Sequence, residues 1–429
     1  MKLKEAKHVH FIGIGGIGMS AVARLLLEEG VLVSGSDIST SRITLDLEAL
    51  GIPISYTQNE GVLPENIDAV VYTVALSDTN PEYQEAKKME VPLFTYSEAL
   101  ANVTEGKEVI AISGTHGKTT TTAMVGHVLK GLGASPTVVV GSLLSETGTN
   151  YIHGNGKYVV LEACEYKRSF LALNPNHLII TNIEPDHLDY YKDIDDISNA
   201  FSELANRVPK EGFVVADTTD DQVKKILESV SATVVPYRSA DVSLRSPGDH
   251  NRKNAGAVVA LLTKLGFSQS DIEKELETFS GTWRRFEYKG LSLGGAKVYD
   301  DYAHHPTEIS ATLQGARELF PDKKIIVVFE PHLFSRTKQL FDGFVEALQG
   351  ADEVYLLPIY PAREKDDGSI TSSMLAKEIG VTVQQTKSIV SFPEAQECLK
   401  EKGDDCVILT LGAGTIYQLA HLLTQHTEL

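Results

Sequence analysis

The chain has 429 residues, more than one hydrophobic core usually holds, so its length predicts about three domains. It carries 39 Lys and Arg residues against 58 Asp and Glu residues, a formal net charge of −19. The average surface would therefore repel a nucleic-acid backbone, and we expect no nucleic-acid partner. Three cysteines without paired metal-ligand spacing predict no disulfide framework and are typical of a reducing, cytoplasmic compartment.

The N-terminus places lysines ahead of an apolar run, a pattern that superficially resembles a secretory signal. Four glycines interrupt that run between residues 13 and 18. Cleavage after the run would also remove the glycine-rich motif at residues 13–18, which is better explained as part of the mature protein. We therefore expect no secretory signal. No other run is long and apolar enough to span a bilayer, so we expect no membrane partner.

Residues 8–20 have the pattern of a strand, a G-x-G-x-x-G turn and the start of a helix. The next strand ends at Asp37, about 20 residues past the turn, which nearly completes the dinucleotide-binding fingerprint. We expect a diphosphate near Gly15 to Gly18, with Asp37 as a partner for a hydroxyl or a base. The alternative for Asp37 is a turn residue at a strand end. After a strand over 67–76, Pro81 is placed to begin a helix.

A second glycine turn lies within residues 109–122, VIAISGTHGKTTTT, an apolar strand that leads directly into a helix ending near Leu132. The N–H groups of such a turn and the positive end of the helix bind phosphate. The common loop has a glycine five residues before its Gly-Lys pair, and Ile112 stands there, so this loop is a compact variant. Lys118 should reach the terminal phosphates of ATP, and Thr119 should offer a hydroxyl to Mg²⁺. An incidental glycine-rich turn is the alternative.

Two strands after this loop end in residues suited to a metal ion. Glu162 closes the strand over 158–162, and Pro185-Asp-His187 follows the strand over 178–184. Open α/β sheets bind ligands at the carboxyl ends of their strands. Glu162 is therefore a candidate ligand for Mg²⁺ or Mn²⁺, and the neighbouring acids make His187 a second candidate.

Polar residues at 249–254 precede a helical segment that begins at Ala255. Asn251 and Asn254 are either helix caps or readers of adenine, because an amide can form paired hydrogen bonds with that base. Arg284 and Arg285 follow at the expected domain border, where they could clamp a phosphate.

The C-terminal part alternates strands with helices again, which predicts another doubly wound sheet. The strands lie at 297–301, 324–329, 353–358 and 406–411. Gly412-Ala-Gly414 is better explained as a tight turn than as a third nucleotide loop. The strand ends carry more charge than inert loops need: Asp300, Asp301, His304, His305, His332, Arg336 and Arg363.

Six motifs in this order resemble the Mur ligase family, ATP-dependent amide-forming enzymes of peptidoglycan synthesis, and the resemblance covers the whole chain. The motifs lie at residues 13–20, 113–119, 181–187, 250–254, 284–286 and 300–306. The resemblance implies an α/β protein of three domains. A Rossmann-like domain over 1–106 would bind the UDP-sugar, and a P-loop domain over 107–286 would bind ATP and Mg²⁺ or Mn²⁺. A Rossmann-like domain over 287–429 would admit the amino acid and close over both.

Within the family the motifs are most similar to those of the branch that joins L-alanine to UDP-N-acetylmuramate through an acyl phosphate. The resemblance implies a monomer or weak homodimer and the following sites. UDP-sugar binding falls to Gly15, Gly16, Ile17, Gly18, Asp37, Thr73 and Ala75; ATP binding to Gly114, Thr115, His116, Gly117, Lys118, Thr119, Thr120, Asn254, Arg285 and Asp300; amino-acid binding to His305, His332, Arg336 and Arg363; the metal to Thr119, Glu162 and His187; and catalysis to Lys118, Glu162, His187 and Arg336.

Four departures from the family pattern are visible. Cys164 stands in the acid stretch that follows Glu162, and Leu333 stands where an arginine is usual. Arg363 replaces a more usual glycine and could relocate the lost cation. Residues 194–208 contain no lysine, although several relatives carry a modified one there; the alanine-adding branch is expected to lack it.

Three other functions remain open on the sequence. A related ligase joins the same nucleotide sugar to a peptide in cell-wall recycling, but the residues of the first glycine turn favour the alanine branch. A catalytically silent UDP-sugar sensor would not need Lys118, Thr119, Glu162 and His187. A dehydrogenase would bind NAD at the first glycine turn but leaves the phosphate loop unexplained.

Overall fold

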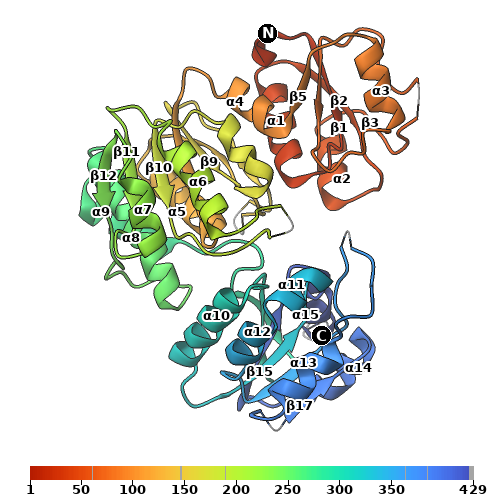
Figure 1. Ribbon diagram of the computed structural model, residues 1–429, viewed down its shortest axis with the longest axis vertical. Helices are drawn as coiled ribbons and strands as arrows, with labels where there is room; N and C mark the ends of the chain where they lie inside the picture. The colour runs from red at the N-terminus through yellow and green to blue at the C-terminus, as the bar shows by residue number, and fades with distance from the viewer. Residues whose placement is uncertain (60, 145–146, 189, 363, 384, 425–429) are drawn as a thin grey trace. The chain divides into compact units, whose positions relative to one another are not determined.

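The computed structural model describes residues 1–59, 61–144, 147–188, 190–362, 364–383 and 385–424. The chain forms three open α/β sheets, which follow one another along the sequence from red to blue in Figure 1. By their internal contacts the residues group into two compact units. The first comprises Met1–Ala240 and Asn254–Leu276, and the second Asp241–Lys253 and Glu277–Leu429.

The first sheet is parallel and has the strand order β3-β2-β1-β4-β5. The order reverses between β1 and β4, which makes the carboxyl end of β1 a ligand-binding position. Val9 and Phe11 face α1 and α4, whereas Ile12 faces the opposite side with Ala86 of α3. The elements are η1 Leu3–Glu5, β1 His8–Ile12, α1 Ile17–Glu28, β2 Leu32–Ser36, α2 Arg42–Ala49, β3 Ile54–Ser55, β4 Ala69–Tyr72, α3 Pro81–Lys88, β5 Leu93–Thr95 and α4 Tyr96–Val103.

The second sheet has the order β12-β11-β10-β6-β9-β7-β8 and is parallel except for β8, which runs antiparallel to β7. Its central strands are largely apolar because helices cover both faces. The elements are β6 Glu108–Ser113, α5 Lys118–Gly131, β7 Thr137–Val139, β8 Tyr151–Ile152, β9 Tyr158–Glu162, η2 Tyr166–Ala172, β10 His177–Ile180, α6 Ile194–Ala205, β11 Phe213–Ala216, α7 Asp221–Leu227, β12 Thr233–Pro236, α8 Asp249–Lys264 and α9 Gln269–Thr278.

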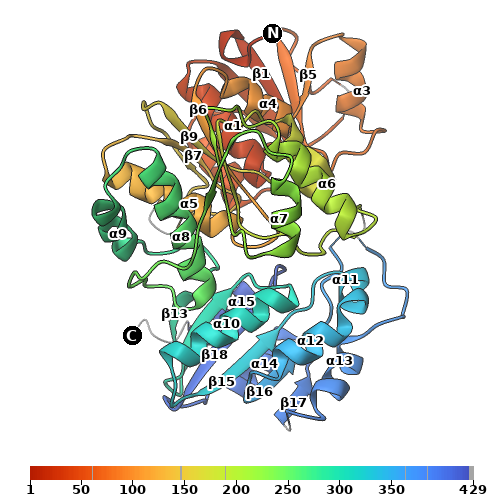
Figure 2. The ribbon, with the colours of Figure 1, turned by 60° about the vertical axis from the view of Figure 1, so that its left-hand side comes forward.

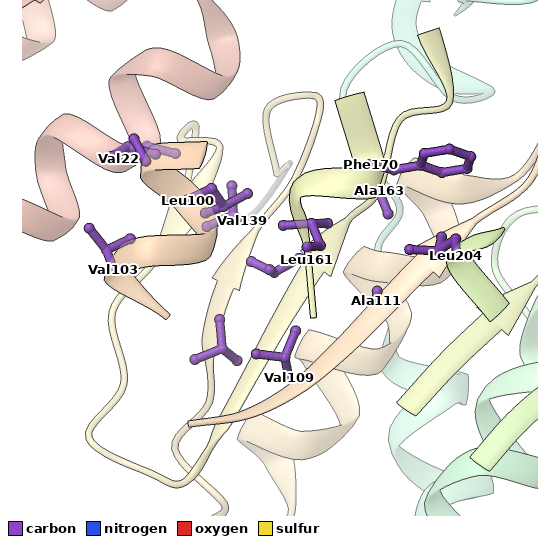
Figure 3. Close-up of a cluster of buried hydrophobic side chains, with 14 of the residues drawn as sticks. Val22, Leu100, Val103, Val109, Ala111, Val139, Leu161, Ala163, Phe170 and Leu204 are labelled. Atoms are coloured by element: carbon purple, nitrogen blue, oxygen red, sulfur yellow. The ribbon is translucent and has the colours of Figure 1, made fainter. Parts of the chain in front are cut away.

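One continuous hydrophobic core joins the first two sheets within the first unit (Figure 3). Val22 of α1 and Leu100 of α4 belong to the same cluster as Val109 of β6 and Leu161 of β9. Polar contacts reinforce this junction, because the Asn150 side chain donates hydrogen bonds to the Ile17 carbonyl and to Ser20 Oγ. The change of sheet near residue 106 is thus not a break in packing, and the boundaries expected at 106 and 286 stay predictions.

The third sheet has the order β13-β14-β18-β15-β16-β17, with β13 antiparallel to β14. Val327 and Phe329 face α10, α12 and α13, whereas Ile326 and Val328 face α14 and α15, so the sheet is doubly wound as expected. Figure 2 shows α10 and α12 packed side by side. The elements are β13 Glu287–Leu291, β14 Lys297–Asp301, α10 Pro306–Leu319, β15 Lys324–Phe329, α11 Phe334–Gln339, α12 Phe341–Leu348, β16 Glu353–Leu356, α13 Ser372–Ile379, β17 Gln385–Ser388, α14 Phe392–Leu399, β18 Cys406–Leu411 and α15 Tyr417–Thr424.

Among the described residues, no helix has the length and apolar character that crossing a membrane requires.

Arg284 holds the third sheet together at the carboxyl ends of β14 and β18. Its side chain is 2% exposed and donates to Asp300 Oδ2 at 2.7 Å and to the carbonyls of Gly412 and Gly414 at 2.5 and 3.0 Å. Asp300 is fully buried and also accepts from Thr410 Oγ1. The hypothesis that Arg284 clamps a phosphate gains no support from this structure, because the side chain is buried and each guanidinium nitrogen already donates a hydrogen bond inside the domain.

The same contacts settle two related expectations. The loop after β18 presents the carbonyls of Gly412 and Gly414 to a cation, which agrees with a tight turn and not with a nucleotide loop. Asp300, which we expected to bind ATP, has Arg284 and Thr410 as partners instead of a free carboxylate. This prediction for Asp300 gains no support from the fold.

We predict that Arg284→Ala lowers the free energy of unfolding by about 3–5 kcal/mol, because it leaves the Asp300 carboxylate buried without its cation. Arg317 is a matched control, since it also forms a 2.7 Å pair with an aspartate, Asp352, but is 37% exposed. Arg317→Ala should cost about 1 kcal/mol or less. Urea unfolding followed by circular dichroism measures both, and equal losses would contradict the structural role of Arg284.

Candidate functional site

The phosphate loop connects β6 to α5 through two glycines with positive φ angles. Gly114 has φ 138° and Gly117 has φ 82°. A Cβ on Gly114 would lie 1.9 Å from Thr181 Oγ1, and one on Gly117 would lie 2.6 Å from Asn254 Oδ1. Both positions therefore require glycine for backbone conformation and for space. The predicted loop residues from Gly114 to Thr120 all lie at this corner, at the positive end of α5.

Residues that follow β10 hold the phosphate loop in its conformation through hydrogen bonds. The Asn182 side chain accepts from His116 N at 2.9 Å and donates to the His116 carbonyl at 3.0 Å, while Thr181 Oγ1 donates to the same carbonyl. Thr115 Oγ1 accepts from Glu184 N. The strand predicted over 178–184 ends at Ile180, because residues 181–184 turn away from the sheet to form these bonds. The second and third motifs of the sequence thus meet across neighbouring strands.

Lys118 folds back over its own loop. Its Nζ donates to the carbonyls of Gly114 and Thr115 at 2.5 and 3.0 Å and lies 3.0 Å from both carboxylate oxygens of Glu165. Burial lowers the pKa of Lys118, but the Glu165 charge and hydrogen bond, together with other nearby charges that include Glu162, outweigh burial and hold that pKa above its ordinary value. The lysine is thus a fixed cation at the mouth of the loop, as the phosphate role requires.

Thr119 and Glu162 lie together, as expected of two ligands of one metal ion. Thr119 Oγ1 donates to Glu162 Oε1 at 3.0 Å, and Gly141 N donates to Glu162 Oε2 at 2.7 Å. A hydroxyl and a carboxylate oxygen at the foot of a phosphate loop are hard donors of the kind that Mg²⁺ prefers. These residues fit a magnesium or manganese ion.

His187 is held close to the loop in an unusual backbone conformation. Its φ is 52°, a strained value that residues other than glycine keep mainly where function or packing demands it. The ring packs on Tyr166 at 4.9 Å, and Nε2 lies 3.5 Å from Glu165 Oε1 and 3.7 Å from Asp186 Oδ2. The arrangement turns an imidazole nitrogen toward the acid that Lys118 contacts.

Asn251 and Asn254, each predicted to be either a helix cap or a contact of adenine, have different surroundings in the structure. The helix begins at Asp249 and not at Ala255, so the polar residues form its first turns. Asn251 donates to the Pro247 carbonyl at 2.8 Å, which is a structural bond of the capping kind. Asn254 instead lies against Gly117 of the phosphate loop, where an amide is placed to contact a nucleotide.

The candidate UDP-sugar residues converge at the carboxyl end of β1. Asp37 Oδ2 accepts from Gly15 N at 2.8 Å, and its other oxygen accepts from Ile38 N. A Cβ on Gly13 would meet Thr73 at 2.7 Å, so the loop after β4 lies against the glycine turn. Thr73 Oγ1 accepts from Ala75 N. Asp37 therefore occupies an N–H of the glycine turn in this structure.

Tyr96 is a further candidate site residue, which the sequence did not indicate. It begins α4, and its ring stands where a Cβ on Gly18 would come within 2.5 Å. Burial raises the pKa of the Tyr96 phenol, and the nearby charges of Glu162 and Cys164 raise it further. Tyr96 therefore lies between the glycine turn of the first sheet and the acid stretch of the second. No feature of its local sequence indicates this position.

The second unit gathers part of the expected amino-acid site around His332. The His332 ring stacks on Tyr360 at 5.6 Å, and the His304 ring meets it edge-on at 6.1 Å. Arg336 Nη1 lies 3.3 Å from His332 Nδ1. Leu333, in place of the expected arginine, is buried and has φ 71°. Arg336 is thus the cation that the structure places beside His332.

His305 has a local role at the start of α10. It is the N-terminal cap of the helix, where its Nδ1 accepts from Thr307 N at 3.3 Å, and its side chain is buried. Arg363, the other expected amino-acid residue, lies outside the described residues.

Arg285 differs from its neighbour Arg284. Its Nη1 is 3.8 Å from Glu308 Oε1, its guanidinium lies 5.3 Å from the centre of the Tyr302 ring, and the side chain is 27% exposed. Burial, together with the Arg285 charge, lowers the pKa of His250 to about 4, so that imidazole is neutral at neutral pH. Arg285 keeps the partial exposure that a ligand contact requires.

The chain is a three-domain α/β protein with a candidate glycine-turn site in its first sheet and a candidate phosphate-loop site in its second. Three family descriptions match the chain: the Mur ligase family catalytic domain at residues 8–108, the Mur ligase middle domain at 112–237, and the Mur ligase glutamate ligase domain at 284–414. The chain belongs to the Mur ligase family, and the resemblance found in the sequence is confirmed.

Relatives of similar length share much of the sequence. The UDP-N-acetylmuramate–L-alanine ligase of Clostridium kluyveri is 42% identical, with 97% of each chain covered. The ligase of the same name from Clostridium acetobutylicum is 41% identical, with 98% of each chain covered. The crystal structure of UDP-N-acetylmuramate-alanine ligase from Thermotoga maritima matches with a TM-score of 0.82 at 33% identity, over 98% of this chain and 99% of that one.

A murein peptide ligase from Psychrobacter arcticus has the same fold, with a TM-score of 0.70 at 22% identity, over 97% of this chain and 98% of that one.

We predict that Gly117→Ala weakens ADP binding about tenfold or more, because its Cβ would strain the loop and push Asn254 away. Gly133 is the matched control: it follows α5, has φ 75°, and, its chain neighbours aside, leaves open space for 4 Å around the place that a Cβ would take. Gly133→Ala should cost about 1 kcal/mol of stability and leave ADP affinity unchanged. Calorimetric titration with ADP measures both, and equal affinities for the two variants would contradict the prediction.

Proposed function

We propose that this chain joins L-alanine to the carboxylate of UDP-N-acetylmuramate, with ATP converted to ADP and phosphate, in peptidoglycan precursor synthesis. The observation that carries the proposal is the placement of Lys118 and of the Thr119–Glu162 pair at one glycine-rich loop, in a chain that is 42% identical over 97% of its length to a ligase of that name. A catalytically silent sensor would not need this site, and an NAD-dependent dehydrogenase would not use it.

The chemistry follows from the weak reactivity of a carboxylate toward an amine. A carboxylate oxygen attacks the γ-phosphorus of ATP, the bond to the bridging oxygen breaks, and ADP leaves. The amine of L-alanine then attacks the carbon of the acyl phosphate, phosphate leaves, and the nitrogen loses a proton. Phosphoryl transfer requires mainly positioning and neutralisation of charge, which a preorganised site supplies.

The residues of the first unit divide these tasks. Lys118 and the N–H groups of the phosphate loop would hold the phosphates, and Asn254 would contact the nucleotide. Thr119 and Glu162, with His187 nearby, would hold Mg²⁺ or Mn²⁺, which supplies further neutralisation of phosphate charge when bound. Gly15 to Gly18 and Asp37 would hold the UDP-sugar.

The direct test uses the purified chain with UDP-N-acetylmuramate, ATP and Mg²⁺, and offers L-alanine, glycine, L-serine and a peptide in separate reactions. Phosphate release and the mass of the product identify the acceptor. We expect release that depends on L-alanine and is absent in Lys118→Ala. Preference for the peptide would assign the chain to recycling, and release without any amine would reject the ligase function.

We predict that Glu162→Gln raises the Mg²⁺ concentration for half-maximal activity about tenfold or more, because a charged oxygen ligand becomes a neutral one. Excess Mn²⁺ should partly restore turnover. Glu203→Gln is the control, since Glu203 is 53% exposed and pairs only with Arg207 among the salt bridges of the described residues. An unchanged metal dependence in Glu162→Gln would return Glu162 to a structural role.

We predict that Arg336→Ala raises the Michaelis constant for L-alanine about tenfold or more, because it removes the cation beside His332 that could bind the substrate carboxylate. Lys338→Ala on the same helix, α11, is the control, because Lys338 is exposed and its loss removes the same charge. Steady-state kinetics with varied L-alanine decide the point. If the constant does not move in Arg336→Ala, the carboxylate binds elsewhere, with Arg363 as the next variant.

A further inference from the structure

Glu165 is a buried acid that contacts two candidate catalytic residues and has no role in the proposed reaction so far. Its side chain is 3% exposed, both oxygens lie 3.0 Å from Lys118 Nζ, and Oε1 lies 3.5 Å from His187 Nε2. The Lys118 ammonium, 3.0 Å from both oxygens, stabilises the ionised carboxylate. The acid is therefore a charged group at the centre of the phosphate site.

The backbone around Glu165 is fixed on both sides. The residue follows β9 and the exposed Cys164, and it directly precedes η2. Its carbonyl accepts from the Tyr191 hydroxyl at 2.5 Å and from Arg168 N at 2.9 Å. These bonds fix the backbone at Glu165. Lys118 has a flexible four-carbon stem, so we expect any adjustment to a nucleotide to come mainly from Lys118.

Lys118 has only as many donors as it has partners here. An ammonium group offers three N–H donors, and the carbonyls of Gly114 and Thr115 and the carboxylate of Glu165 accept them. Phosphate oxygens can reach the ammonium only if one of these partners gives way. Glu165 is the charged member of the three, and its charge is also repelled by phosphate. Glu165 and a nucleotide therefore compete for Lys118.

We propose that Glu165 is a positioning residue of the phosphate site, which holds Lys118 ready before the nucleotide binds, yields the lysine to the phosphates, and keeps His187 oriented toward the same point. The nucleotide part of this proposal stands alone, and the turnover part rests on the proposed ligase function. Glu165 therefore weakens nucleotide binding but increases the rate of turnover.

The proposal predicts that Glu165→Gln changes nucleotide affinity and turnover in opposite directions. The amide keeps the size of the side chain but removes the charge that competes for Lys118. We expect the dissociation constant for ADP, measured by calorimetry in the presence of EDTA, to fall roughly threefold or more. We expect kcat for ligation to fall about tenfold or more, with no rise in KM for ATP, because Lys118 and His187 lose their fixed orientation. Simple structural damage would weaken binding and turnover together.

The chain offers a closely matched control in Glu108. This acid also bridges a histidine and a lysine, with His177 Nε2 at 3.0 Å and Lys157 Nζ at 2.8 Å, but it lies at the first residue of β6, at the far end of the strand from the phosphate loop. Glu108→Gln should leave ADP affinity and kcat unchanged. Thermal unfolding of both variants shows how much of each effect comes from stability.

A double variant identifies the route. If Glu165 acts through Lys118, then Glu165→Gln no longer tightens ADP binding once Lys118 is alanine. Tightening that persists in Lys118→Ala would assign the effect to direct repulsion and overturn the positioning role. If Glu165→Gln does not fold, Glu165→Asp carries the test, because it keeps the charge but withdraws it from Lys118, and tighter ADP binding is again expected.

The result that overturns the proposal is ADP affinity that is unchanged or weaker in Glu165→Gln, or kcat that does not fall. If the wild-type chain shows no ligation but ADP affinity responds as expected, the inference about the nucleotide site holds and the proposed substrates are wrong. The two failures are thereby distinct.

Discussion

The hydrogen bonds between the phosphate loop and the turn after β10 are the constraint on which the nucleotide site depends. Asn182 accepts a hydrogen bond from the backbone N–H of His116, and Asn182 and Thr181 both donate to the His116 carbonyl. Thr181 also fills the space beside Gly114. A glycine-rich loop has much conformational freedom, so its shape must come from neighbours. These bonds orient the loop toward α5, and the positions of Lys118 and Thr119 follow from that orientation.

Buried charges serve different ends in the two units. Lys118 and Glu165 form a pair at the candidate phosphate site, where, on our proposal, phosphate replaces one partner. Arg284 and Asp300 form a pair inside a domain, where two loop carbonyls accept further hydrogen bonds from the guanidinium. A buried ion pair contributes little net stability by itself, but loss of one partner is costly. Access to solvent and ligand therefore decides whether such a pair supports binding or structure.

The junction of the first two sheets connects the two candidate substrate sites of the first unit. Helix α4 contributes Leu100 to the shared core, and its first residue, Tyr96, lies between Gly18 and the acid stretch after β9. The acceptor carboxylate and the γ-phosphate must come within bonding distance for phosphoryl transfer. A shared hydrophobic core between the glycine turn and the phosphate loop is a physical means of fixing that separation.

The sequence by itself determined the elements whose signal is local. The strands at 158–162, 297–301, 324–329 and 406–411 have the bounds that their apolar runs predict, and the glycine turns mark both phosphate-type loops. Only the tertiary structure decided which charges meet. Arg284 pairs with Asp300, whereas Arg285 is partly exposed. Strand β10 ends at Ile180. Glu165 and Tyr96 lie beside the candidate sites. The reason is that periodicity and turn chemistry act over a few residues, whereas the partner of a charge is set by strands and loops far apart in the chain.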